Sequence, residues 1–109
     1  MTTFDDREKG FERKFALDQE VLFLAHARRD KLFGMWAAER MGLKGAEAEA
    51  YAKSIVKEDI AHPGDSDVVH KVSADLAGKG VKVDETELTG VLGEMFAKAK
   101  QQIATESRG

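Results

Sequence analysis

Residues 17–41, LDQEVLFLAHARRDKLFGMWAAERM, carry the pattern that decides the fold. At about 100° per residue, a helix over this stretch has two separate apolar stripes. The first stripe consists of Leu22, Arg29, Phe33, Trp36 and Arg40, and the second of Leu17, Val21, Leu24, Arg28, Leu32 and Met35. The remaining sector holds the small residues Ala27, Gly34 and Ala38. A helix that is apolar or small on nearly every side is surrounded by others, so we expect this one to be the central element of a helical bundle.

Glycines and the single proline divide the rest of the chain into three more helical segments. The second helix is predicted over 46–61 and ends at His62-Pro63-Gly64. A third helix, capped by Asp65 or Ser66, ends at Gly78 and Gly80. The fourth begins after Asp84, which forms a capping-box pattern with Glu87. Short connections between helices predict mostly antiparallel neighbours, and hence an all-α fold with a four-helix bundle in residues 17–109.

Each of these helices has one apolar face. The faces comprise Ala48, Ala52, Ile55 and Val56 in the second helix, Val69, Val72 and Leu76 in the third, and Leu88, Val91, Leu92, Met95, Phe96, Ala99 and Ile103 in the fourth. Gly90 and Gly93 lie away from the last of these faces, where close helix approach and plain tolerance explain them equally well.

Composition narrows the class of protein. A chain of 109 residues with 42% hydrophobic and 34% charged residues is typical of one soluble domain. It contains no cysteine, which excludes disulfides, thiolate catalysis and cysteine-ligated zinc. The net charge of −3 argues against a dedicated nucleic-acid binder. Because no run is long and apolar enough for a membrane span or a signal peptide, we expect a cytoplasmic monomer.

The first sixteen residues differ from the bundle and form a predicted N-terminal arm (residues 1–16). Phe4, Phe11 and Phe15 continue the first stripe of the long helix, whereas Arg7, Gly10 and Lys14 replace the second. A segment this charged, with a glycine in its middle, is a poor helix alone, so we expect a flexible or partly helical arm that orders against a surface. That surface is either a partner's groove or the seam between the third and fourth helices.

Arg28 and Arg29 form the densest basic cluster of the bundle, and Arg29 lies one turn from Phe33 and two from Trp36. Arginines beside an aromatic wall are candidates for binding a nucleotide, with the guanidinium groups on the phosphates. The alternative is that both arginines pair with carboxylates of other helices. Asp59 falls within the apolar arc of its helix, which favours an ion pair with Arg28 or Arg29 over a role in ligand binding.

The sequence offers no catalytic or metal-binding pattern. The histidines, His26, His62 and His70, have no partner at metal-ligand spacing, so we expect no zinc site. The serines show no nucleophile elbow and the glycines no phosphate loop. We therefore predict that the protein is not an enzyme and requires no cofactor.

Several runs together resemble the zeta subunit family of alphaproteobacteria, small inhibitors of the F-type ATP synthase. These runs are Phe4-Asp5-Asp6-Arg7-Glu8, Lys14-Phe15-Ala16, Ala27-Arg28-Arg29-Asp30-Lys31-Leu32-Phe33-Gly34, Trp36-Ala37-Ala38, Glu58-Asp59, Pro63-Gly64-Asp65 and Asp67-Val68. The likeness covers essentially the whole chain. It departs at Asp30, where asparagine is usual, and at Phe33, where leucine is usual.

The resemblance implies a four-helix fold and inhibition of ATP hydrolysis by the N-terminal arm, which enters a catalytic interface of the ATPase head. The arm residues expected to contact that partner are Phe4, Arg7, Phe11, Arg13, Lys14 and Phe15. It further implies a site for ADP or ATP on the bundle, for which Arg28, Arg29, Trp36 and Asp59 are our physical choices. The protein would then be cytoplasmic and peripheral to the inner membrane through the synthase. A non-inhibitory module that responds to nucleotide is the alternative function.

Overall fold

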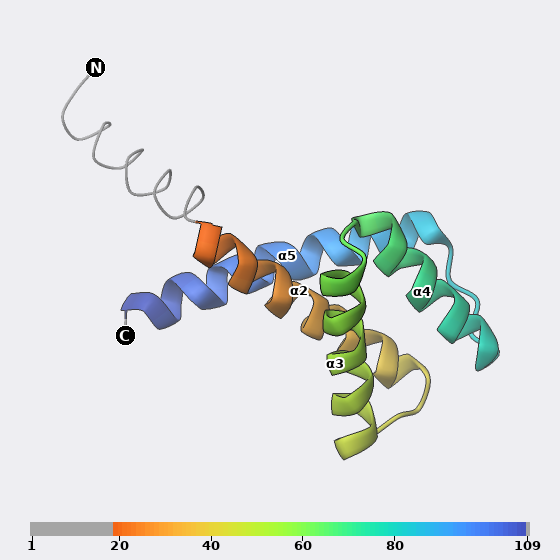
Figure 1. Ribbon diagram of the computed structural model, residues 1–109. Coiled ribbons are helices and arrows are strands. Elements are labelled where there is room, and N and C mark those ends of the chain that lie inside the picture. Colours follow the sequence, from red (N-terminus) through yellow and green to blue (C-terminus); the bar gives the residue numbers. More distant parts are fainter. Residues whose placement is uncertain (1–18, 109) are drawn as a thin grey trace.

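The computed structural model describes residues 19–108, which form four helices (Figure 1). These helices are α2 (Gln19–Arg40), α3 (Gly45–Ala61), α4 (Asp65–Gly78) and α5 (Glu85–Arg108). The all-α prediction is confirmed, and the helix bounds agree with the expected ones to within a residue or two wherever they can be compared. The N-terminal arm and Leu17 lie outside the described residues.

The long helix α2 occupies the centre of the arrangement and contacts each of the other three helices. Figure 1 shows α2 and α5 lying side by side, with α3 crossing α2 and α4 at the far end. The buried side of α2 includes Ala25, Phe33, Gly34, Ala37 and Ala38.

The predicted second stripe of α2 is partly wrong, because Leu24 and Met35 are exposed. The helices packed on α2 cover one broad sector around Phe33, which leaves the opposite side facing solvent. The prediction that other helices surround α2 on nearly every side is therefore wrong, although α2 does lie at the centre of the arrangement.

A cluster of buried side chains from all four helices forms the core. It consists of Phe33, Ala37, Ile55, Val68, Val69, Val72, Leu76, Leu88 and Leu92. The apolar faces predicted for α3, α4 and α5 are confirmed, since their members are buried or half-buried. The first member contributed by α2 is Phe33, fourteen residues after the start of the helix. At about 1.5 Å per residue, Phe33 lies about 20 Å along α2 from that start.

The helix ends show which sequence signals act as caps. Asp84 caps α5, because its Oδ1 accepts the Thr86 N–H at 2.9 Å. The cap predicted for α4 is wrong: Gly64 occupies that position, and its φ of 148° lies in a region that favours glycine. Asp65 is instead the first residue of the helix, which leaves its carboxylate free to bind elsewhere.

Within residues 19–108, no helix combines the length and apolarity needed to cross a membrane.

Candidate functional site

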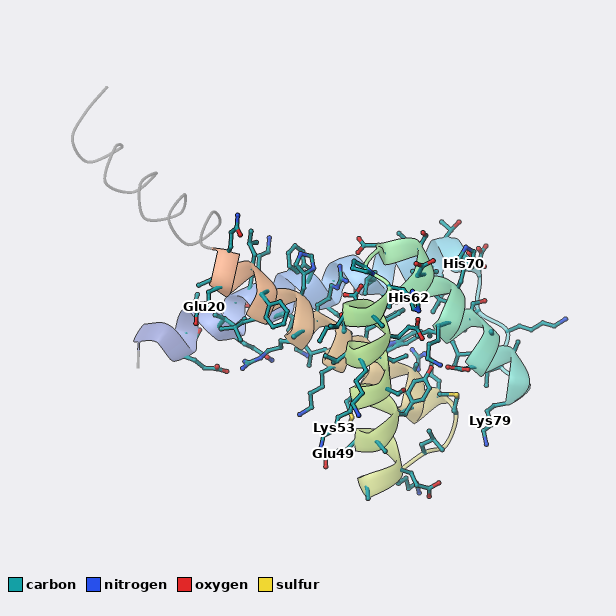
Figure 2. The ribbon with its side chains drawn as sticks, in the orientation of Figure 1. Glu20, Glu49, Lys53, His62, His70 and Lys79 are labelled. Atoms are coloured by element: carbon teal, nitrogen blue, oxygen red, sulfur yellow. The ribbon has the colours of Figure 1, made fainter. Side chains whose placement is uncertain are left out.

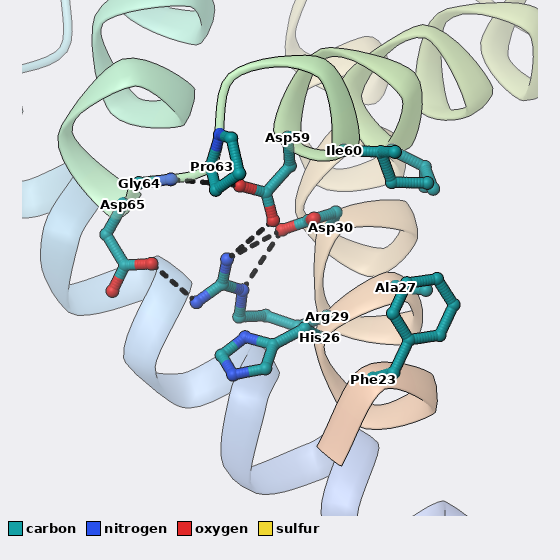
Figure 3. Close-up of a pocket in the computed structure, with 11 residues that line it drawn as sticks. Phe23, His26, Ala27, Arg29, Asp30, Asp59, Ile60, Pro63, Gly64 and Asp65 are labelled. Carbon is teal, nitrogen blue, oxygen red and sulfur yellow. Dashed lines mark hydrogen bonds and ion pairs between the residues drawn. The ribbon is translucent and has the colours of Figure 1, made fainter. Parts of the chain in front are cut away.

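Arg29 is the centre of the most unusual group of side chains in the described structure (Figure 3). Arg29 is only 3% exposed, and its guanidinium donates hydrogen bonds to three aspartates. Nε donates to Asp30 Oδ1 at 3.0 Å, Nη1 to Asp65 Oδ1 at 2.9 Å and Nη2 to Asp59 Oδ2 at 3.3 Å. We call these four residues the Arg29 cluster. It ties α2 to the end of α3 and the start of α4.

The turn between α3 and α4 brings Asp59 and Asp65 to the same guanidinium. Asp59 lies in the last turn of α3, and its Oδ1 accepts the Gly64 N–H at 3.4 Å. The chain therefore folds back over Asp59 through Pro63 and Gly64, and Asp65 follows at once as the first residue of α4. The sequence interpretation of Asp59 as an ion-pair partner is confirmed, with Arg29 rather than Arg28 as the cation.

The cluster holds more negative than positive charge. Burial raises the pKa of Asp30 to about 8, with a further contribution from a hydrogen bond to Asp59, and the Arg29 guanidinium opposes this only in part. Burial disfavours the charge of Arg29, but the Asp30 and Asp65 carboxylates outweigh that effect and raise its pKa. Arg29 is therefore charged at neutral pH, and the pKa of Asp30 lies well above the usual range of an aspartate.

A cavity of about 320 Å³ opens beside the cluster. Its polar side is made by the four cluster residues, and its apolar side includes Phe23 and Ile60. These two side chains are 57% and 58% exposed, an unusual state for large apolar groups. The cavity therefore combines a charged wall with an apolar one and lies open to ligands.

The aromatic neighbour of Arg29 is not the predicted one. Its guanidinium carbon lies 5.8 Å from the centroid of Phe96 in α5, whose ring also stacks on His26 at 4.7 Å. Trp36 instead stacks on Phe33, and the guanidinium of Arg40 lies over the Trp36 ring, with its carbon 4.1 Å from the ring centroid. The predicted pairing of Arg29 with Phe33 and Trp36 fails because α5 inserts its own ring beside the guanidinium.

Of the four predicted nucleotide-binding residues, only Arg29 and Asp59 come together. Trp36 lines a different cavity, with Leu43 and Met95. Arg28 points toward the end of α5, where it pairs with Glu106, and its Nη2 lies 2.9 Å from Glu106 Oε1. This hydrogen bond lowers the pKa of Glu106. Both arginines are therefore engaged by carboxylates, as the alternative interpretation expected.

The histidines are dispersed. Figure 2 shows His62 at the end of α3 and His70 in α4, and their side chains are 70% and 63% exposed. His26 is half-buried against Phe96. In residues 19–108, no group of three or more histidine, cysteine, aspartate or glutamate side chains is arranged to hold a metal ion.

The sequence does not predict the contacts that Asp65 and Phe96 make with Arg29. It indicates a helix cap for Asp65 and a place in the core stripe of the last helix for Phe96. The acidic residue directly after Pro63-Gly64 was the available signal for Asp65, because a tight turn there returns the chain to Asp59. No sequence signal linked Phe96 to Arg29, since they lie 67 positions apart (96 − 29).

The described fold and site together define a small all-helical binding protein, with a charged cavity and no catalytic constellation among the residues described. A family model for ATPase inhibitor subunit zeta matches residues 1–102. The chain belongs to this family. Its members are regulatory proteins that inhibit an ATPase, and not enzymes.

A solved structure of related sequence shares the fold. The chain is similar to a protein whose solution NMR structure is known, with 44% sequence identity and a TM-score of 0.67. The likeness covers 77% of this chain and 95% of that one. No curated protein sequence matches the chain.

Proposed function

We propose that the N-terminal arm carries the inhibitory action, by inserting between subunits of the catalytic head of the F-type ATP synthase. The observation that carries this proposal is the extent of the family match, which includes the whole arm as well as most of the bundle. Phe4, Phe11 and Phe15 would bury against the partner, while Arg7, Arg13 and Lys14 would meet acidic groups there. A wedge of this kind blocks the opening and closing of the catalytic interface that ATP hydrolysis requires.

The arrangement of the bundle supports this role for the arm. The core cluster lies toward the far end of α2 and draws on all four helices without any residue before Phe33. The attachment point of the arm, ahead of Gln19, is therefore at the opposite end of α2 from the core cluster. The arm joins the end of α2 where that helix lies beside the last turns of α5 (Figure 1).

The test is ATP hydrolysis by the cognate purified ATPase head, titrated with the full-length protein. Replacing Phe4, Phe11 and Phe15 by serine should abolish inhibition, because the apolar contact of the wedge is lost. Met35→Ser is the matched control: it also removes one exposed apolar side chain, but from the bundle. Equal inhibition by the triple variant and the wild type would transfer the inhibitory surface to the bundle.

A second proposed function is regulation of the inhibitor by ADP or ATP at the cavity beside Arg29. Its volume falls within the range of small-molecule sites, and it offers a guanidinium for phosphate and an apolar wall for the rest of the ligand. The Asp59 and Asp65 carboxylates accept hydrogen bonds from that guanidinium. Binding must therefore displace at least one of them, which predicts weak affinity and a shift of the α3–α4 turn.

Amide resonances of the 15N-labelled full chain test this second function during an ADP titration. Shifts at Arg29, Asp59 and Gly64 are expected, and Phe23→Ser should weaken them while Met35→Ser leaves them unchanged. Shifts confined to Arg28 or Trp36 would place the nucleotide elsewhere on the bundle. An absence of shifts, with ATPase inhibition retained, would leave an inhibitor without nucleotide control.

A further inference from the structure

Two carboxylates of the Arg29 cluster meet at one nitrogen atom. Nη2 of Arg29 lies 2.9 Å from Asp30 Oδ1 and 3.3 Å from Asp59 Oδ2. The Asp30 and Asp59 side chains are only 2% and 14% exposed, so solvent screens neither well. Figure 3 shows the two carboxyl groups next to each other, one from α2 and the other from α3.

The surrounding charges do not neutralise this pair. Helix α2 contributes Arg29 and the half-buried His26, and the start of α4 contributes Asp65, whose side chain is 68% exposed. Helix α5 presents the uncharged ring of Phe96 to Arg29, with Lys100 Nζ 4.6 Å from the centroid of that ring. One buried guanidinium thus faces two buried carboxylates and a third that solvent reaches.

The two carboxyl groups differ in burial and in their donors. Asp59 also accepts the Gly64 N–H, whereas Asp30 accepts from Arg29 Nε and Nη2 and has no backbone donor among its described contacts. Asp30 is the more deeply buried of the two, and this burial raises its pKa.

We propose that Asp30 and Asp59 share one proton, and that this proton joins α2 to the α3–α4 turn, so that its release above neutral pH loosens the turn. Without the proton, two carboxylates repel each other across the contact between α2 and α3. Only one of them can then be balanced by Arg29. We call this contact, in which one proton holds α2 to the α3–α4 turn, the latch. It lies beside the cavity.

The direction of the pH effect follows from proton linkage. The usual pKa of an aspartate in an unfolded chain is about 3.9, which is below that of Asp30 in the folded protein. Between these two values the folded state binds one proton more than the unfolded state, so the contribution of Asp30 to stability falls as pH rises. The loss is up to about tenfold in the folding equilibrium constant per pH unit, and it levels off above the folded pKa.

Denaturant unfolding of the full-length protein between pH 6 and 8 tests the latch. Asp30→Asn mimics the protonated acid but cannot ionise, so the ratio of folding constants, variant to wild type, should rise by up to about 50-fold over this interval, because the effect levels off near the folded pKa of about 8. The three histidines are present in both proteins, so any contribution they make cancels in the ratio. Asp67→Asn is the control: it removes an exposed carboxylate near the same turn, and its ratio should stay constant.

A direct measurement covers the case in which Asp30→Asn fails to fold. The side-chain carboxyl 13C resonance of Asp30 in the wild-type protein should titrate with a midpoint above pH 7, and amide exchange at Gly64 and Asp65 should accelerate over the same range. A midpoint near 4, or a variant-to-wild-type ratio that does not change with pH, would overturn the proposal.

Discussion

Arg29 shows how one buried side chain can connect three helices. Each of its three nitrogen atoms donates to a different aspartate, and two of these aspartates belong to α3 and α4. The planar guanidinium suits this task because its donors have fixed, diverging directions, which a lysine ammonium lacks. Arg28, the preceding residue, makes one ion pair at the surface. The two adjacent arginines therefore differ in how much their ion pairs contribute to stability.

Replacing Arg29 by methionine should destabilise the protein by about 3–5 kcal/mol, because the substitution leaves buried carboxylates without their cation. Arg28→Met is the matched control and should cost less than about 1 kcal/mol, since exposed ion pairs contribute little. Urea unfolding of both variants at pH 7 measures the difference. Similar losses in the two variants would show that the Arg29 cluster is not a structural centre.

At the scale of the helices, α2 and α3 approach each other closely at Gly34. A Cβ atom added there would lie 2.7 Å from the Cα of Ala52, a backbone atom that cannot move aside. Gly90 and Gly93 have nothing within 4 Å of such an added atom, so plain tolerance explains them. The two open interpretations of the α5 glycines are thereby resolved, and the close approach is found instead at a glycine of α2.

Gly34→Ala should lower the free energy of unfolding by about 1–3 kcal/mol, because the methyl group overpacks the contact between α2 and α3. Gly90→Ala should instead stabilise the protein by up to about 1 kcal/mol, through the better helix propensity of alanine. Thermal unfolding of the two variants gives the comparison. Stabilisation by both substitutions would mean that α3 can move away from α2 without cost.

A hydrogen bond between Tyr51 and Asp75 makes a further link between α3 and α4. The Tyr51 hydroxyl donates to Asp75 Oδ2 at 2.8 Å, and Lys71 Nζ lies 3.2 Å from the same oxygen. Burial, together with the neighbouring carboxylate, raises the pKa of Tyr51, so its hydroxyl keeps its proton at physiological pH.

Tyr51→Phe should cost about 1 kcal/mol, since it removes this hydrogen bond and leaves the ring in place. The same substitution made in an Asp75→Ala background should cost much less, because the acceptor is already gone. Urea unfolding of the wild type, both single variants and the double variant completes the cycle. Equal costs in the two backgrounds would show that the hydrogen bond does not couple α3 to α4.

At the scale of the whole molecule, the core and the attachment point of the arm lie at different places. The core cluster draws on α2 only from Phe33 onward, while the beginning of α2 packs chiefly along α5, with His26 on Phe96 and Arg28 on Glu106. The proposed function of the arm would therefore use one part of the chain while another part maintains the fold.

A chain that begins at Leu17 should therefore keep the unfolding free energy of the full-length protein to within about 1 kcal/mol, since none of the described core side chains is removed. Circular dichroism during urea unfolding measures it. A much larger loss would show that the arm contributes to the core and would favour the interpretation in which it covers the bundle.

The sequence by itself determined the helices, their ends to within a residue or two, and the apolar faces of α3, α4 and α5. These features are local: periodicity near 3.6 residues and the glycine and proline breaks act over a few positions along the chain. The family was also identifiable from motifs along the chain. The sequence further indicated that Asp59 needs a cation, because burying a carboxylate on the apolar face of a helix is costly unless the carboxylate is paired.

Only the tertiary structure decided which groups meet. The turn at Pro63-Gly64 brings Asp65 to Arg29, α5 supplies Phe96 in place of the expected Trp36, and solvent rather than a helix covers Leu24 and Met35. The physical reason is that periodicity fixes the faces of a helix but not the rotation and crossing of its neighbours. The rotation and crossing of the helices depend on the packing and charge contacts of all four helices together. No single segment of the sequence predicts these contacts.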